Sequence, residues 1–282
     1  QDGKNDLDIY GGSWWNANLT MLSALQWAGY AVENQWGEGG HNGKHGGAIL
    51  PDAMRWLWAD FEQPIATKTA DHPELKNRLI EGEDWKLVSE GHKYTEGPAV
   101  APDGSVYFVD GPRGEIWKVN PGGKGATKFI DDMPGVSALM FDAQGRLYCA
   151  RNKAQTLTRV DPDGTRTDLA NGMSCNDLVV LDHGIYFTGP LEQTIWYLPN
   201  GGKPTKVGRG PKLPNGLIAT PDQRFLLVVD AAGRYVWSYR IGQDGQLQHG
   251  QPYSYVHSPQ DEMNTGADGA TMTADGSLLV AT

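Results

Sequence analysis

The chain has few cysteines, no long apolar run and no surplus of positive charge. Its 282 residues contain two cysteines, Cys149 and Cys175, which are too few to indicate a redox compartment. We expect them to be buried free thiols rather than a disulfide. No apolar stretch approaches the roughly 20 residues that cross a bilayer. The net charge of -10, with Lys and Arg scattered along the chain, argues against a nucleic-acid partner.

The N-terminus also lacks an initiator Met and the apolar core of a signal peptide, so we expect the chain to begin inside a longer reading frame. What the chain does have is 39% hydrophobic residues, including ten Trp. That content is enough to bury a sizeable core in one large or two ordinary domains. The composition is that of a soluble globular protein.

The first 60 residues differ in pattern from the rest. Residues 14–30 predict an amphipathic helix, residues 31–36 a short strand, and residues 51–59 a second helix after a loop rich in Gly and His. This α/β arrangement is too short for an independent domain, because a strand of a parallel sheet needs neighbours covered on both faces. Residues 61–84 are mixed and polar with two Pro, which suits a linker.

From residue 85 onward, five polar residues occupy the same position in successive repeats. Each lies seven residues before a polar turn residue and is followed by an apolar run that predicts a strand. The five are Glu96, Ser137, Asn176, Asn215 and Asp268. A repeat of roughly 40 residues with several short strands is typical of a β-propeller blade. Because blades stack radially, we expect these residues to surround one channel, where oxygen side chains without Cys or His suit a hard divalent cation.

The number of repeats predicts an incomplete propeller. Residues 97–257 contain four blades, and a fifth begins at Gly269 and stops at Thr282 after its second strand. A propeller of this repeat length normally closes with about six blades. We therefore predict a mainly β, six-bladed propeller over residues 85–282, truncated at its C-terminus, with about 4.5 blades present.

Four motifs in phase with this repeat carry a family resemblance. They are Thr95-Glu96-Gly97-Pro98, Asn176-Asp177-Leu178-Val179-Val180, Pro214-Asn215-Gly216-Leu217 and Gly266-Ala267-Asp268-Gly269. The region from Trp85 onward resembles the senescence marker protein/gluconolactonase family, which includes regucalcin, bacterial sugar lactonases and, more distantly, diisopropyl fluorophosphatase. The resemblance implies a propeller fold and a metal-dependent hydrolase that acts on a small-molecule sugar lactone.

The resemblance also implies that Glu96, Asn215 and Asp268 bind one divalent cation, with Asn176 beside them against metal or substrate. Two carboxylates and two amides carry a formal charge of -2 and leave room for water and substrate. Calcium fits this set best, and magnesium, manganese and zinc are alternatives. Asp268 is the expected general base, because it can touch both metal and water. Members acting on acidic lactones often carry an Arg two residues before the Asn that matches Asn176, where this chain has Ser174.

Structural roles are the alternatives for the individual residues. Asn215 and Asp268 each precede a glycine and could form turns. Ser137 is expected to be structural, and Asp230 is expected to cap the end of its strand. At the level of the whole protein, the alternative is a propeller that binds calcium without turnover, as an accessory to an upstream carbohydrate esterase.

The first 60 residues carry a second resemblance, on Trp36-Gly37-Glu38-Gly39-Gly40-His41-Asn42 and Gly3-Lys4-Asn5-Asp6. These segments resemble the region around the catalytic histidine in the esterase family of α/β hydrolases that includes enterochelin and feruloyl esterases. Residues 1–60 would then be the C-terminal fragment of such a domain, with His41 as base and Asp6, or instead Asp2 or Asp8, as acid. No Gly-x-Ser-x-Gly elbow occurs in the chain, so this fragment is not expected to catalyse acyl transfer. Such esterase fusions are usually located outside the cytoplasm, which favours a periplasmic or secreted protein.

Overall fold

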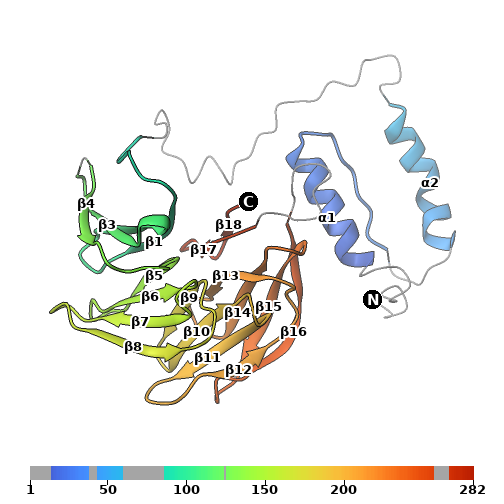
Figure 1. Ribbon diagram of the computed structural model, residues 1–282. Coiled ribbons are helices and arrows are strands. Elements are labelled where there is room, and N and C mark those ends of the chain that lie inside the picture. The colour runs from blue at the N-terminus through green and yellow to red at the C-terminus, as the bar shows by residue number, and fades with distance from the viewer. Residues whose placement is uncertain (1–13, 38–42, 60–85, 124, 257–266) are drawn as a thin grey trace. The chain divides into compact units, whose positions relative to one another are not determined.

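A computed structural model of the chain describes residues 14–37, 43–59, 86–123, 125–256 and 267–282 (Figure 1). The chain divides into two compact units, residues 1–85 and residues 86–282. No helix within the described residues is both long and apolar enough to cross a membrane.

The described residues of the first unit contain two helices, α1 (Trp14–Trp27) and α2 (Gly43–Leu57). Helix α1 confirms the predicted helix and ends at Trp27; Gly29, two residues later, has a φ of 78° in the left-handed region. There the amide of Gly29 donates to the carbonyl of Gln26 at 3.0 Å, and the amide of Tyr30 donates to the carbonyl of Leu25 at 3.0 Å. This pair of bonds is a Schellman motif, for which glycine is favoured because it lacks a Cβ.

Two predictions for this unit were wrong. Helix α2 begins at Gly43 rather than near residue 51, so Pro51 lies inside it and leaves the carbonyl one turn earlier without its intrahelical donor. Residues 31–36 form no strand, because no other strand pairs with them among the described residues. The α/β hydrolase fragment therefore stays a prediction, and Asp6 and His41 lie outside the described residues.

The second unit is built from antiparallel sheets, four of four strands and one of two strands within the described residues (Figure 1). The first sheet comprises β1 (Thr95–Val100), β2 (Val106–Asp110), β3 (Glu115–Val119) and β4 (Thr127–Ile130). The second comprises β5 (Ala138–Phe141), β6 (Leu147–Arg151), β7 (Thr156–Val160) and β8 (Arg166–Asn171). The third comprises β9 (Leu178–Leu181), β10 (Gly184–Gly189), β11 (Thr194–Pro199) and β12 (Thr205–Gly208), and the fourth β13 (Pro214–Ala219), β14 (Phe225–Asp230), β15 (Tyr235–Ile241) and β16 (Leu247–Tyr255). The two-stranded sheet is β17 (Ala270–Met272) and β18 (Leu278–Val280).

Each sheet is a meander whose first strand packs beside the first strand of the next sheet. Contacts join β1 to β5, β5 to β9, β9 to β13 and β13 to β17. This is the propeller-like arrangement that the repeat predicts, and the five predicted first strands are confirmed as strands. Closure into six blades stays a prediction.

The core lies between successive sheets rather than within one of them. Four hydrophobic clusters alternate with the sheets, and each draws residues from two neighbours; Val109 and Leu147, for example, meet between the first and second sheets. Cys149 and Cys175 belong to two of these clusters. Both are free and buried, as predicted. Each of the second, third and fourth sheets is therefore covered on both faces by its neighbours.

The converging first strands approach too closely for a side chain at two glycines. A Cβ on Gly97, whose φ is +56°, would lie 2.6 Å from the Cα of Ala138. A Cβ on Gly216 would lie 2.4 Å from the main-chain carbonyl oxygen of Asp268, to which the Gly216 amide donates at 3.0 Å. Both glycines fall where the strand register shifts, and such irregularities redirect neighbouring side chains.

Asp230 confirms the predicted cap at the end of strand β14. Its Oδ2 accepts the amide of Lys212 at 2.9 Å and its Oδ1 accepts the amide of Leu213 at 2.9 Å. The side chain is buried, so these bonds replace the water it would otherwise hold. The carboxylate ties the end of the second strand to the segment that enters the first.

Replacing Gly97 with alanine tests the close approach between the first two sheets. Gly97→Ala should lower the free energy of unfolding by about 2 kcal/mol or more beyond the matched Gly145→Ala, because the new methyl group overlaps main-chain atoms that cannot move aside. Gly145 also has a left-handed φ, +76°, but its Cβ would meet nothing within 4 Å, so it reports the conformational cost alone. Urea unfolding of both variants measures the difference, and equal losses would contradict the tight contact.

Candidate functional site

A cavity of about 680 Å³ opens where the first strands of the five sheets begin. Its lining includes all five residues of the repeat position: Glu96, Ser137, Asn176, Asn215 and Asp268. The structure therefore brings together the four predicted site residues that fall among the described residues. The remaining two, Asp6 and His41, lie outside the described residues.

Four of the five side chains have no bonding partner among the described residues. Within the described part of the chain, the side chains of Glu96, Asn176, Asn215 and Asp268 take part in no hydrogen bond or ion pair. All four are half-buried. Oxygen atoms that face a cavity without partners are available to a ligand, whereas buried polar groups in a purely structural role are normally bonded.

Ser137 differs, as expected of a structural residue. Its hydroxyl donates to the main-chain carbonyl of Asn176 at 2.7 Å and its amide donates to the carbonyl of Ala150 at 2.9 Å. These bonds connect the start of β5 to β6, the second strand of the same sheet, and to the segment that enters β9. The hydroxyl thereby fixes the main chain of a neighbouring site residue rather than offering itself to a ligand.

Asp177 is a site residue that the sequence reasoning did not single out. It lines the cavity, and its carboxylate accepts the amides of Leu178 at 2.8 Å and of Leu217 at 3.0 Å. The second bond links the third sheet to the fourth, directly between Asn176 and Asn215. The available signal was its place beside Asn176 in the Asn-Asp motif, but the repeat position pointed to Asn176 alone.

The cavity concentrates negative charge. Burial raises the pKa of Glu96 to about 7, reinforced by the charges of Asp268 and Asp177 and opposed by Lys153. Burial also raises the pKa of Asp177 to about 7, against the two amides it accepts and with the help of Asp268. The pKa of Tyr94, at the edge of the cavity, is raised by the charges of Asp268 and Glu96 and by burial, so its phenol is a neutral donor.

These features fit a divalent cation. Carboxylate and amide oxygens are the ligands of hard cations, and a dication would relieve the repulsion that raises the Glu96 pKa. In the described residues, no three His, Cys, Asp or Glu side chains are grouped closely enough to hold a metal by themselves. A cation here would therefore depend on the amides of Asn176 and Asn215 as well as on the carboxylates.

Ser174 faces away from this cavity. It is fully buried, its amide donates to Oε1 of Glu192 at 3.1 Å, and its hydroxyl donates to Oε2 of the same carboxylate. Glu192 thus ties down the segment that enters β9, much as Asp230 ties down the segment that enters β13. The residue that stands at the family's arginine position is part of the scaffold in this chain.

Comparison with known proteins gives the family. Residues 94–282 match the family described as SMP-30/Gluconolactonase/LRE-like region, and the chain belongs to it. Lactonase drp35 of Staphylococcus aureus is 22% identical over 226 residues, which cover 74% of this chain and 69% of that protein. Both the resemblance seen in the motifs and the propeller-like fold of the second unit agree with this membership.

Two solved structures show the same fold. The gluconolactonase XC5397 from Xanthomonas campestris aligns with a TM-score of 0.59 at 21% identity, over 68% of this chain and 70% of its own. A structure described as a putative gluconolactonase aligns with a TM-score of 0.64 at 20% identity, over 74% of this chain and 78% of its own. At these identities the likeness establishes architecture, while the chemistry has to be argued from the cavity.

The raised pKa values predict how stability depends on pH when divalent cations are removed. Glu96 and Asp177 have pKa values of about 7 in the folded protein, above their ordinary 4.5 and 3.8. Between these limits the folded state binds more protons than the unfolded state, so the free energy of unfolding falls as pH rises from about 4 to about 8. Urea unfolding in a chelator at several pH values measures this slope.

Glu96→Gln is the control for that slope. It removes one of the two titrating groups, so its stability should fall less steeply over the same pH range, and it should exceed the parent protein in stability at pH 8. A slope identical to that of the parent would mean that Glu96 does not titrate near neutrality. Glu90→Gln, an exposed residue of the same unit outside the cavity, should leave the slope unchanged.

Proposed function

We propose that this protein is a metal-dependent hydrolase of sugar lactones and that the cavity at the start of the first strands is its active site. The observation that carries the proposal is the convergence of four uncommitted oxygen side chains, two of them acidic, in one cavity with surplus negative charge. Membership of the gluconolactonase-containing family and similarity to drp35, a lactonase, support the reaction class.

Glu96, Asn215 and Asp268 would hold the cation, with Asn176 beside them. Calcium is the proposed ion, because the set contains only oxygen donors and includes two neutral amides; magnesium, manganese and zinc are the alternatives. A bound dication supplies Lewis-acid polarisation of the lactone carbonyl. Asp177 would keep the Asn176 and Asn215 segments together through its bond to the Leu217 amide.

The residues of the chain supply the rest of the reaction. Asp268 accepts a proton as water attacks the carbonyl carbon and gives it to the ring oxygen as the ring carbon–oxygen bond breaks, which yields a hydroxy acid. The amide of Asn176 can donate a hydrogen bond to a substrate oxygen. The neutral phenol of Tyr94 offers a second donor at the edge of the cavity.

The charge of the cavity favours neutral substrates. Asp177 adds a third carboxyl group to those of Glu96 and Asp268, and Ser174, at the position of the family's arginine, is bonded to Glu192 instead of facing the cavity. An acidic lactone would meet repulsion without a cationic partner at that position. We therefore assign neutral sugar lactones as the substrate class.

Glu96→Gln tests the cation site. Calorimetric titration with calcium should show one site in the parent protein and an affinity at least about tenfold weaker in the variant, because one of two charged ligands is lost. The matched Glu90→Gln makes the same chemical change at an exposed position outside the cavity and should bind calcium as the parent does. Equal affinity in Glu96→Gln and the parent would refute the ligand assignment.

Asp268→Asn separates binding from turnover. The asparagine keeps an oxygen for the cation but cannot accept the proton of water, so lactone hydrolysis should fall by roughly 10²-fold or more while calcium affinity falls less. A pH-stat assay on a panel of lactones measures turnover. Asp163→Asn, in an exposed turn, is the matched control and should leave turnover unchanged. Near-normal turnover in Asp268→Asn would leave a calcium-binding propeller without the proposed catalytic base.

A further inference from the structure

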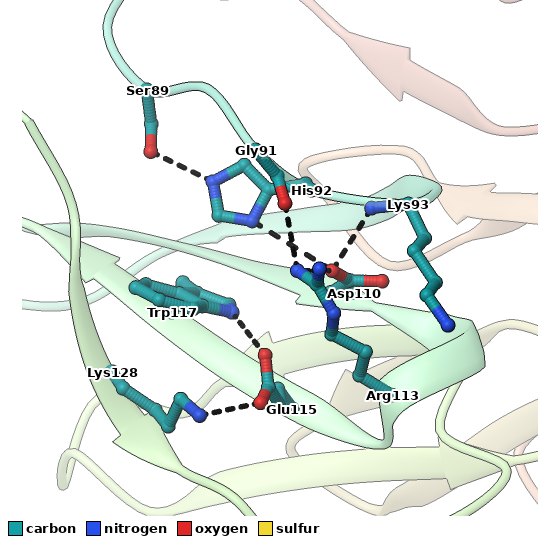
Figure 2. Close-up of polar contacts among 9 residues, drawn as sticks. All are labelled: Ser89, Gly91, His92, Lys93, Asp110, Arg113, Glu115, Trp117 and Lys128. Atoms are coloured by element: carbon teal, nitrogen blue, oxygen red, sulfur yellow. Dashed lines mark hydrogen bonds and ion pairs between the residues drawn. The ribbon is translucent and has the colours of Figure 1, made fainter.

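Three side chains of the first sheet and its entering segment are arranged in series as Ser, His and Asp (Figure 2). The hydroxyl of Ser89 lies 2.7 Å from Nε2 of His92. On the other side of the ring, Nδ1 of His92 faces Oδ2 of Asp110 at 3.8 Å. This is the order in which a serine nucleophile, its base and the acid that orients the base are placed in acyl-transfer enzymes.

The histidine is held in one orientation in a largely dry environment. The His92 side chain is only 9% exposed, and its ring meets the edges of Phe108 and Trp117 at centroid distances of 5.0 and 4.8 Å. Trp117 is itself fixed by a bond from its Nε1 to Glu115, which also pairs with Lys128 (Figure 2). Nδ1 has no hydrogen-bond partner among the described residues, so the nearby carboxylate is the group that can hold its proton.

Asp110 differs from its counterpart in a way that favours this role. Asp230, at the same position in the fourth sheet, uses both oxygens to accept main-chain amides. Asp110 accepts the Lys93 amide on Oδ2 at 3.1 Å and, in addition, the Arg113 guanidinium on the same oxygen at 3.0 Å. The carboxylate is fully buried, and its Oδ2 faces His92. The fourth sheet has no histidine at the corresponding position.

Asp110 is ionised at neutral pH and its neighbours hold the histidine segment in place. Burial acts to raise the pKa of Asp110, but the amides of Lys93 and Tyr94 and the guanidinium of Arg113 outweigh it and lower the pKa below its ordinary value. Arg113 also donates to the carbonyl of Gly91 at 2.8 Å. His92 thus lies between two residues, Gly91 and Lys93, that are both tied to the Asp110 cluster.

The series opens onto a pocket of about 290 Å³. The pocket is lined by Ser89, His92, Thr95, Glu96, Pro98 and Phe108. Ser89 is half-buried at its wall, which leaves the hydroxyl accessible to a small molecule. The amides of Glu90 and Gly91 follow the serine directly, are exposed, and donate to no acceptor among the described residues, so they are available to a developing oxyanion.

We propose that Ser89, His92 and Asp110 form a second hydrolytic site, for small carboxylic esters, that works without a metal. The Ser89 hydroxyl oxygen attacks the ester carbonyl carbon while its proton passes to Nε2 of His92. The carbon–oxygen bond to the alcohol breaks, and His92 returns the proton to the leaving alkoxide. Water then attacks the acyl-serine with His92 as base, which releases the acid and restores the serine. Its pocket shares Thr95, Glu96 and Pro98 with the proposed lactonase cavity, but its reaction uses no cation.

Covalent labelling of the full chain tests the nucleophile directly. Phenylmethanesulfonyl fluoride transfers its sulfonyl group to an activated serine with loss of fluoride, and peptide mass mapping identifies the residue. We expect one adduct, on Ser89, at the same rate with and without chelator. His92→Gln preserves the size of the side chain but removes the base, so labelling and p-nitrophenyl acetate hydrolysis should both fall roughly 10²-fold or more.

Ser89→Ala should abolish the adduct and the p-nitrophenyl acetate activity, whereas Ser254→Ala, a serine of β16 in the outer part of the fourth sheet, should change neither. Folding of each variant is checked by its thermal unfolding transition. If folded parent protein shows no adduct on Ser89, or if a folded His92→Gln reacts as fast as the parent, the three side chains have a structural role alone and the proposal fails. The parent protein alone decides the matter if His92→Gln does not fold.

Discussion

The structure depends on how closely the first strands of successive sheets approach one another. The contacts are made by main-chain atoms: Gly97 lies against the start of β5, and the Gly216 amide donates to the carbonyl of Asp268. Two side chains add bonds between sheets. The Ser137 hydroxyl donates to the main-chain carbonyl of Asn176, and the Asp177 carboxylate accepts the main-chain amide of Leu217. This chain of contacts is what brings polar side chains more than 170 residues apart in sequence, from Glu96 to Asp268, into one cavity.

The same convergence places carboxyl groups close together in a partly buried cavity, which is electrostatically unfavourable when they are charged. Burial, reinforced by the charge of Asp268, raises the pKa values of Glu96 and Asp177, and Lys153 is the positive charge that opposes this at Glu96. A fold that needed these groups only as turn formers would have no reason to leave Asn176, Asn215 and Asp268 without partners among the described residues. Functional sites are commonly less stable than the scaffold that holds them, and the proposed cation site would fit that relation.

Much of this could be predicted from the sequence, because the repeat reports strand position directly. The phase of Glu96 and Asp268 predicted that they share a cavity, and each predicted first strand formed. Asp177 was missed because its role depends on an amide forty residues away. Ser89 and His92 were missed because they lie in the segment before β1, whereas their partner Asp110 lies at the end of β2. The strand over residues 31–36 failed because a strand needs a partner that local pattern does not supply.

Anomalous diffraction from crystals grown with manganese, a hard cation that the same oxygen donors accept, tests the cation site directly. We expect one strong anomalous peak inside the cavity, within coordination distance of Glu96, Asn215 and Asp268. A map with no peak in the cavity, or with its only strong peak elsewhere on the protein, would contradict the claim that the convergence of the first strands builds a cation site.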